Sequence, residues 1–253
     1  MHKISVYVLT FNNERTIERC LKSVRWADEI VVVDHYSSDR TPETCRRYTK
    51  HFYQKEWTNY RDEYNYAVTL ASHDWVMFLD SDEEISEELA QEIQGELAHN
   101  DGRWAGYGAP RVTYYLGRWI RHGEWYPDYK IRFYDRTKGK WGGRALHPRI
   151  EVAGAVKRLT HACLHYNYKD ISDQIQTIDR YSEMAAQVLD EEHERSGFLK
   201  MLLHPPFRFL RDYFLRRGFL DGLPGFIIAV STMYYVFIKY AKLWERQRGL
   251  KKG

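Results

Sequence analysis

Two carboxylates separated by a single serine are the most chemically suggestive feature of the sequence. Asp80 and Asp82 directly follow the apolar run at residues 75–79. An apolar run bounded by charge predicts a buried strand, and acids at its carboxyl end indicate a site. Their oxygens could bind one hard cation, and that cation could in turn bind a diphosphate. Glu83 and Glu84 come next, and we interpret them as charges at the start of a helix.

Three strand, loop and helix units are expected to position these acids. The apolar runs at residues 4–9, 29–33 and 75–79 predict strands, and each is followed by a polar loop and a helical pattern. Such alternation is typical of an α/β fold with a mostly parallel sheet, in which ligands bind outside the carboxyl ends of the strands. The polar residues at those ends should therefore meet at one edge. They are Asn12 to Glu14, Asp34 to Asp39, and Asp80 to Glu84.

Composition agrees with a globular protein that works in a reducing compartment. The chain has 253 residues, 43% of them hydrophobic, which is enough for a sizeable core. Its 3 cysteines are far apart and show neither disulfide nor zinc-site spacing. The first apolar stretch is too short for a signal peptide, so we expect a cytoplasmic catalytic part. The motifs GxGxxG and GxxxxGK are absent, which argues against Rossmann dehydrogenases and P-loop proteins.

The C-terminal part differs from the rest in charge and hydropathy. From Arg195 onward there are 12 Lys and Arg residues against 3 Asp and Glu residues, a net charge of +9, whereas the remainder carries −6. A helix is expected from Ser172, a break at Pro205 and Pro206, and a basic aromatic helix over residues 207–220. The uncharged run 223–238 would be about 24 Å long as a helix, short of a bilayer core of roughly 30 Å.

Two interpretations of this C-terminal part stay open. A partly embedded or interfacial anchor on an anionic membrane surface would explain an apolar run followed by lysines and arginines. A buried helical hairpin with a basic solvent face would explain the same pattern. Nucleic acid is not an expected partner, because the basic residues alternate with long apolar runs.

Ordered segments along the chain resemble a known family. The front half is similar to family 2 glycosyltransferases with the GT-A fold in VLTFNNERTIERCLKSV, DEIVVVDHYSSDRTPET and WVMFLDSDEEIS. The block YLGRWIRHGEWYPDYKIRFYDR, with LHPRIEV, CLHYNY and the tail, resembles the WaaE-like lipopolysaccharide core glucosyltransferase subgroup. The resemblance implies a GT-A domain at residues 1–195, followed by a helical, membrane-associating extension at residues 196–253.

The activity implied by this resemblance is an inverting sugar transfer at the cytoplasmic face of the inner membrane. A UDP-sugar, with glucose as the expected sugar, would donate to a hydroxyl of a lipopolysaccharide-core or other lipid-linked glycan. The alternatives are a polyprenyl-phosphate glycosyltransferase and a non-catalytic protein that binds sugar nucleotides at the membrane. The acceptor, the sugar and the oligomeric state are not determined by the sequence.

Donor-site roles follow from the resemblance position by position. Asp82 would hold Mg²⁺ or Mn²⁺, with Asp80 on the ribose or on a metal-bound water, to stabilise the departing diphosphate. Asp34 would hydrogen-bond the uracil or ribose. The residues expected to line the same pocket are Thr10, Asn12 and Glu14. Asp39 is interpreted as an Asx residue that structures its loop. Many relatives carry a basic residue where this chain has Tyr64, so that contact is assigned to Arg61.

The acceptor side requires one general base to take the hydroxyl proton. Asp128, within Trp125 to Tyr129, is the first candidate because an acceptor sugar could stack on these aromatic residues; Glu124 is the second. A turn aspartate after proline is the plain alternative for Asp128. His147 and His165 could complete the metal shell or contact phosphate, although a structural histidine is also common. Arg132 is expected to pair either with the diphosphate or with Asp135. Pro148 replaces a glutamate that is common in the subgroup, so no role is assigned there.

Overall fold

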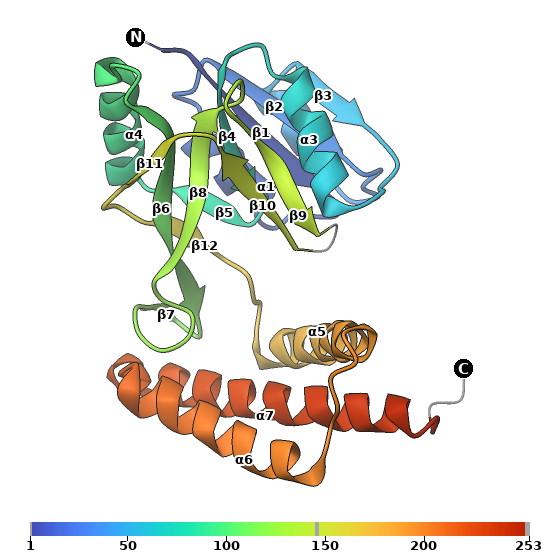
Figure 1. Cartoon of the computed structure of the whole chain (residues 1–253). Coiled ribbons are helices and arrows are strands. Elements are labelled where there is room, and N and C mark those ends of the chain that lie inside the picture. The colour runs from blue at the N-terminus through green and yellow to red at the C-terminus, as the bar shows by residue number, and fades with distance from the viewer. Residues whose placement is uncertain (1, 145–146, 251–253) are drawn as a thin grey trace. The chain divides into compact units, whose positions relative to one another are not determined.

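The computed structural model describes residues 2–144 and 147–250 and divides into two compact units (Figure 1). One unit comprises residues 1–112 and 128–166, and the other comprises residues 113–127 and 167–253. Each unit is described by itself below. The boundary expected at residue 195 stays a prediction about the domains, and the helix that precedes it belongs to the second unit.

The sheet of the first unit begins with a parallel half. Four strands pair in the order β3, β2, β1 and β4, and all of them are parallel. Their bounds are β1 Ile4–Thr10, β2 Glu29–Asp34, β3 His51–Gln54 and β4 Trp75–Asp80. β1, β2 and β4 confirm the three expected strands. β3 was not predicted, because four residues are too few to show a clear period.

The other half of the sheet contains antiparallel pairs, which makes the sheet mixed. β8 pairs antiparallel with β4 and with β6, and β5 pairs antiparallel with β12. Their bounds are β5 Glu83–Ile85, β6 Trp104–Tyr115, β8 Asp128–Asp135 and β12 Cys163–His165. β11 (Ala155–Arg158) joins β6, and β9 (Gly139–Arg144) pairs with β10 (His147–Val152) in a separate ribbon. The expected α/β sheet flanked by helices is confirmed.

Helices cover both faces of this sheet. Alternate residues of β1 separate two cores: Val6 and Val8 pack with α1, α2 and α4, whereas Tyr7 packs with α3 and the β9–β10 ribbon. The bounds are α1 Ile17–Ser23, α2 Thr41–Tyr48, α3 Tyr60–Leu70 and α4 Glu87–His99. α4 starts where expected, because the side chain of Ser86 accepts a hydrogen bond from the Leu89 amide.

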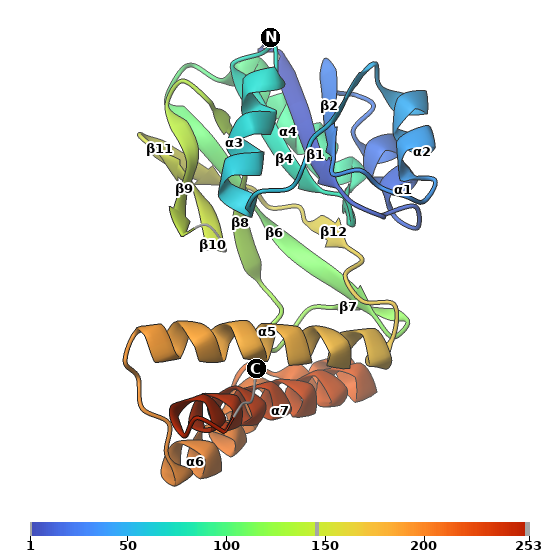
Figure 2. The same ribbon diagram turned by 90° about the vertical axis from the view of Figure 1, so that its right-hand side faces the viewer.

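The second unit consists of helices and a short β-ribbon, in which β7 (Arg118–Ile120) pairs with the end of β6. α7 packs against both α5 and α6 (Figure 2). The helical bounds are α5 Ile171–Glu191, α6 Phe198–Leu210, the π-helix η1 Arg211–Leu215, the 3-10 helix η2 Gly218–Asp221 and α7 Gly222–Gln247. Within the described residues, one helical segment, Gly218–Gln247, is long and apolar enough to cross a membrane by length and composition alone.

The break expected at Pro205 and Pro206 is wrong. Both prolines lie inside α6, which continues from Phe198 to Leu210. Each proline lacks the backbone N–H that would donate a helical hydrogen bond, but the φ angle that its ring imposes is compatible with a helix. Packing of α6 along α7 supplies the stability that propensity lacks.

Candidate donor and acceptor site

Strand register brings the predicted donor-site residues together in the first unit. Thr10 at the end of β1 lies opposite Asp34 at the end of β2, and Leu9 lies opposite Asp80 of β4. Parallel strands end at the same edge, so three polar loops meet there. The sequence predicted this convergence.

Asn13 connects the first loop with the acidic loop. Its Oδ1 accepts hydrogen bonds from Thr10 Oγ1 at 3.1 Å, from the Phe11 amide at 3.0 Å and from Ser81 Oγ at 2.9 Å. Thr10 itself is buried. Sequence reasoning placed Asn13 in a polar loop but assigned it no role. Its contact with Ser81, 68 positions away, produces no local pattern in the sequence.

Asn12 and Glu14 hold the second loop. Asn12 Oδ1 accepts a hydrogen bond from the Ser38 amide at 2.8 Å, and Glu14 Oε2 accepts one from the Arg40 amide at 3.2 Å. Asp39 accepts hydrogen bonds from the amides of Thr41 and Glu14, which confirms it as a loop-structuring residue. The hydrogen bonds of Asn12 and Glu14 to the second loop fix the shape of this edge of the sheet. Contacts of these two side chains with a nucleotide stay a prediction.

Asp34 is fully buried, and its carboxylate is already hydrogen-bonded. It accepts hydrogen bonds from the Ser37 amide at 3.0 Å, from Ser37 Oγ and from Gln54 Nε2 at 2.9 Å. Gln54 is exposed, and it comes from the strand that the sequence did not predict. Through these hydrogen bonds Asp34 orients the side chains of Ser37 and Gln54. Direct contact of Asp34 with uracil or ribose stays a prediction.

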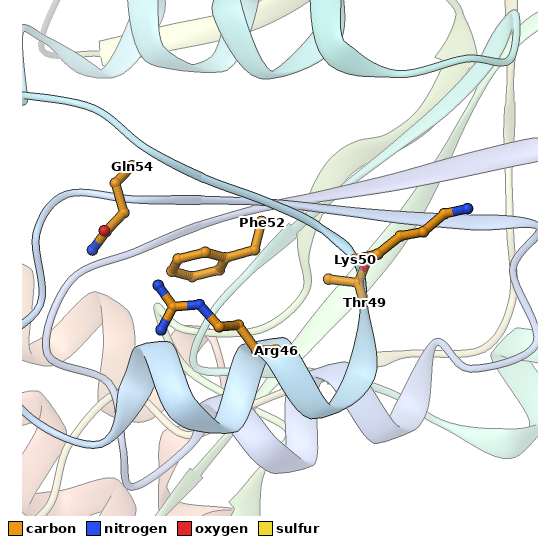
Figure 3. A pocket seen from close by; sticks show the side chains of 5 residues that line it. All are labelled: Arg46, Thr49, Lys50, Phe52 and Gln54. Carbon is orange, nitrogen blue, oxygen red and sulfur yellow. The ribbon is translucent and has the colours of Figure 1, made fainter.

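Gln54 also borders a hollow on the first unit. This hollow has a volume of about 400 Å³ and is lined by Arg46, Thr49, Lys50, Phe52 and Gln54 (Figure 3). The guanidinium of Arg46 lies 4.4 Å from the centre of the Phe52 ring. None of the acids of the Asp80 loop lines the hollow.

Arg61 lies in the first turn of α3. Its Nε donates to Asp62 at 3.0 Å, and 39% of its side chain is exposed. Tyr64, which replaces the basic residue of many relatives, stacks on Trp141, and the neighbouring Asn65 exchanges hydrogen bonds with the Trp141 backbone. A ligand contact of Arg61 stays a prediction.

Glu83 is a buried ion-pair partner, so its interpretation as a helix-start charge is wrong. It lies in β5, ahead of the Ser86 cap, and its two oxygens accept hydrogen bonds from Arg132, with Nη2 at 2.8 Å. Pairing of β5 with β12 draws Glu83 into the sheet. Arg132 is 1% exposed and pairs with Glu83 instead of Asp135. A contact of Arg132 with a diphosphate stays a prediction.

Glu84 likewise does not cap the helix. It accepts a hydrogen bond from Tyr166 Oη at 2.8 Å. Both corrections have the same cause: the chain forms a short strand between the acidic loop and α4, so the acids are used in tertiary contacts before the helix begins.

Negative charge is concentrated around Asp80. Burial, together with the charges of Glu83 and Asp82, raises the pKa of Asp80 to about 7. Burial alone would raise the pKa of Glu83 as well, but Arg132 and then Arg111 hold it well below its ordinary value. A divalent cation fits at such a place, because it would relieve repulsion between carboxylates.

Asp82 is the accessible acid of this group. Its side chain is 27% exposed, and its Oδ2 lies 3.3 Å from Nε2 of His165. Among residues 2–144 and 147–250, no three acidic, histidine or cysteine side chains gather to hold a metal ion by themselves. Asp82, with Asp80 and His165 nearby, would therefore hold an ion whose other ligands are oxygens of the diphosphate and water. The side chain of His147 lies outside what the structure describes.

Asp128, the first candidate base, is held by Arg111. Nε of Arg111 is 3.1 Å and Nη2 is 2.6 Å from Asp128 Oδ2, while Nη1 is 3.4 Å from Glu83 Oε1. Burial alone would raise the pKa of Asp128, but Arg111 and Lys130 lower it overall. Arg111 therefore links Asp128 to Glu83 of β5, and sequence reasoning did not single it out.

Glu124, the second candidate, lies in the second unit. Its carboxylate is paired with Arg211 at 2.7 Å and also with Arg208 and Arg216. Three guanidinium groups on one carboxylate are typical of a structural ion-pair network. Its role as a base stays a prediction.

The first unit has a fold of the GT-A type. Parallel strands end at the acidic loop, and antiparallel strands place a further carboxylate in the same unit. A solved structure with this fold is the mannosyltransferase PcManGT from Pyrobaculum calidifontis in complex with GDP-Man and Mn²⁺. It superimposes with a TM-score of 0.52 at 13% identity and covers 100% of this chain and 76% of its own.

Sequence comparison gives the family. Residues 5–158 match glycosyl transferase family 2, and the chain belongs to this family. It is 28% identical over 250 residues to the lipopolysaccharide core biosynthesis glycosyltransferase LpsC of Rhizobium meliloti, covering 96% of this chain and 92% of LpsC. It is 27% identical over 257 residues to an uncharacterized glycosyltransferase of Rickettsia typhi, covering 97% of this chain and 88% of that relative. The resemblance read from the sequence is confirmed.

Proposed function

We propose that this family 2 enzyme transfers a sugar, with glucose as the first candidate, from a UDP-sugar to a hydroxyl of a lipopolysaccharide-core or other lipid-linked glycan. The acceptor class is supported by the likeness to LpsC over nearly the whole of both chains. Transfer would take place at the cytoplasmic membrane face, which the basic and apolar C-terminal part supports.

One observation carries the proposal: a continuous charge network joins the acidic loop to Asp128. Glu83 binds Arg132 and Arg111, and Arg111 binds Asp128. Asp80 and Asp82, the proposed place of the leaving diphosphate, directly precede Glu83 in the chain. Asp128, at the other end of the network, is the proposed carboxylate for the acceptor. A protein that only binds sugar nucleotides has no need of a carboxylate placed for an acceptor.

The residues divide the chemistry as follows. Asp128 stays ionised because its pKa is lowered, so it can accept the proton of the acceptor hydroxyl as the new bond to the anomeric carbon forms. The bond between that carbon and the diphosphate breaks on the opposite side, which inverts the configuration. A divalent cation bound at Asp82 would supply positive charge to the departing diphosphate.

The test is release of UDP from UDP-glucose with Mn²⁺ and a lipopolysaccharide-core acceptor. We expect Asp82→Ala to abolish release while far-UV circular dichroism shows a folded protein. Asp74→Ala is the matched control, because Asp74 is an exposed aspartate before the same strand. An unchanged rate in Asp82→Ala would contradict the proposal. Transfer to undecaprenyl phosphate instead would identify a polyprenyl-phosphate glycosyltransferase.

A further inference from the structure

The outer face of α6 and η1 is apolar, although it points away from the rest of the second unit. Eight Leu and Phe side chains there are each more than half exposed. They are Phe198, Leu199, Leu202, Leu203, Phe207, Leu210, Phe214 and Leu215, and we call them the outer face. Leu199, Leu203 and Phe207 recur every four residues, so they form one stripe along the helix. Exposed apolar patches of this kind mark surfaces that bind a protein, a membrane or a ligand.

Asp212 and the two arginines that bind it lie on the inner side of the same segment. Asp212 is 2% exposed and accepts hydrogen bonds from Arg208 and Arg211, both at 2.8 Å. The same two arginines pair with Glu124. Amphipathic helices of soluble proteins usually have the reverse orientation, with the apolar stripe inside and charge outside.

Charge around the outer face is positive. From Phe198 to Leu223 the chain has 5 basic and 2 acidic residues. Both acids, Asp212 and Asp221, are buried. Asp221 accepts hydrogen bonds from the amides of Arg121 and His122. Glu124 pairs with Arg208, Arg211 and Arg216, and Glu194 pairs with Lys200, so part of this positive charge is balanced locally. Exposed Arg217 lies outside these pairs, and its charge complements anionic lipid headgroups.

α7 does not have this character, although it is the longest helix in the described part of the chain and is apolar enough to cross a membrane. Lys242 on α7 pairs with Asp179 of α5 at 2.8 Å, and Arg246 pairs with Glu183 at 3.2 Å. Its buried residues, such as Ile228 and Ala229, pack within the unit. Spanning a bilayer would break these ion pairs and separate α7 from both neighbouring helices.

We propose that the outer face of α6 and η1 inserts into the headgroup region of an anionic lipid bilayer, with the helix lying in the membrane plane. The apolar stripe would enter the acyl boundary, and the basic residues beside it would bind lipid phosphates. α7 then serves as the scaffold that supports α6. This inference rests on the proposed function at a membrane face and names the surface that would make the contact.

The test is co-sedimentation of the full chain with vesicles of phosphatidylcholine and phosphatidylglycerol. The variant Leu203→Glu/Phe207→Glu places two charges in the stripe at exposed positions, so the fold should be retained. We expect its affinity for the vesicles to fall by roughly 100-fold, since charge replaces two inserted apolar groups. Leu203→Ser/Phe207→Ser should also reduce binding, without adding charge.

Matched controls separate the two helices and the two kinds of interaction. Tyr234→Glu/Phe237→Glu alters two exposed apolar residues of α7 and should bind vesicles like the wild type. Lys200→Gln/Arg217→Gln should weaken binding to anionic vesicles and should leave the weaker binding to pure phosphatidylcholine unchanged.

Three results would overturn the inference. The first is wild-type sedimentation of Leu203→Glu/Phe207→Glu, and the second is release of the α7 variant from vesicles. The third is a wild-type dimer in light scattering that Leu203→Glu/Phe207→Glu dissociates, with no vesicle binding, because the face would then cover a second copy. Vesicle binding without sugar transfer would leave this inference intact and refute the proposed function; UDP release by a protein that never binds vesicles would do the reverse.

Discussion

Arg111 and Asp128 stand directly opposite each other on the antiparallel strands β6 and β8, and the guanidinium of Arg111 holds one carboxylate oxygen of Asp128 with two nitrogens. The third nitrogen of the same guanidinium approaches Glu83, next to the metal-site candidate Asp82. Arg111 thereby connects Asp128, the candidate base, to Glu83 through a single side chain.

Asp128→Asn should remove sugar transfer and retain donor binding. The amide keeps the shape but cannot take the acceptor proton, and loss of a general base costs about 100-fold to 10,000-fold in rate. UDP release measures the first effect, and the thermal shift produced by UDP-glucose with Mn²⁺ measures the second. Near-normal transfer would instead make Glu124 the candidate, and Glu124→Gln would then be the decisive variant.

Arg111→Gln should shift the pH dependence of transfer. Arg111 lowers the pKa of Asp128, so its removal raises that pKa. The ionised carboxylate is the base, and a higher pKa means that a larger share is protonated at low pH. The acidic limb of the profile of kcat/KM against pH should therefore move to higher pH. Arg111→Lys should move it less, and a profile that stays in place would show that Arg111 does not tune the base.

Glu83→Gln should destabilise the fold strongly. The substitution leaves the buried guanidinium of Arg132 without its charged partner, which costs about 3–5 kcal/mol in comparable pairs. Urea unfolding of the variant and wild type measures the difference in free energy of unfolding. Glu84→Gln is the matched control, because Glu84 is only partly buried, and about 1 kcal/mol or less is expected there. Equal effects of the two variants would refute the role given to Glu83.

Removal of divalent ions should abolish donor binding. EDTA is expected to eliminate the thermal stabilisation by UDP-glucose, and Mn²⁺ should restore it, since the ion would link Asp82 to the diphosphate. Asp82→Asn should lose the response to Mn²⁺, whereas Asp74→Asn should keep it. Full stabilisation by UDP-glucose in EDTA would contradict a metal-dependent donor site.

The sequence alone determined the parts of this protein that depend on local pattern and on order along the chain. The apolar runs indicated β1, β2 and β4, and their polar ends indicated the edge at which Thr10, Asp34 and Asp80 meet. The ordered segments also identified the family, which the match of residues 5–158 confirms.

Only the tertiary structure decided which side chains pair and which faces are covered. Glu83 became the partner of Arg132, 49 positions away, because β5 and β8 both join one sheet. Arg111 reached Asp128 through antiparallel register, which no local period encodes. The sequence predicted a break at Pro205 and Pro206, whereas packing against α7 keeps α6 continuous and leaves its apolar stripe facing outward. The periodicity of a sequence separates an apolar from a polar face of a helix, and the neighbouring elements decide which of these faces meets solvent.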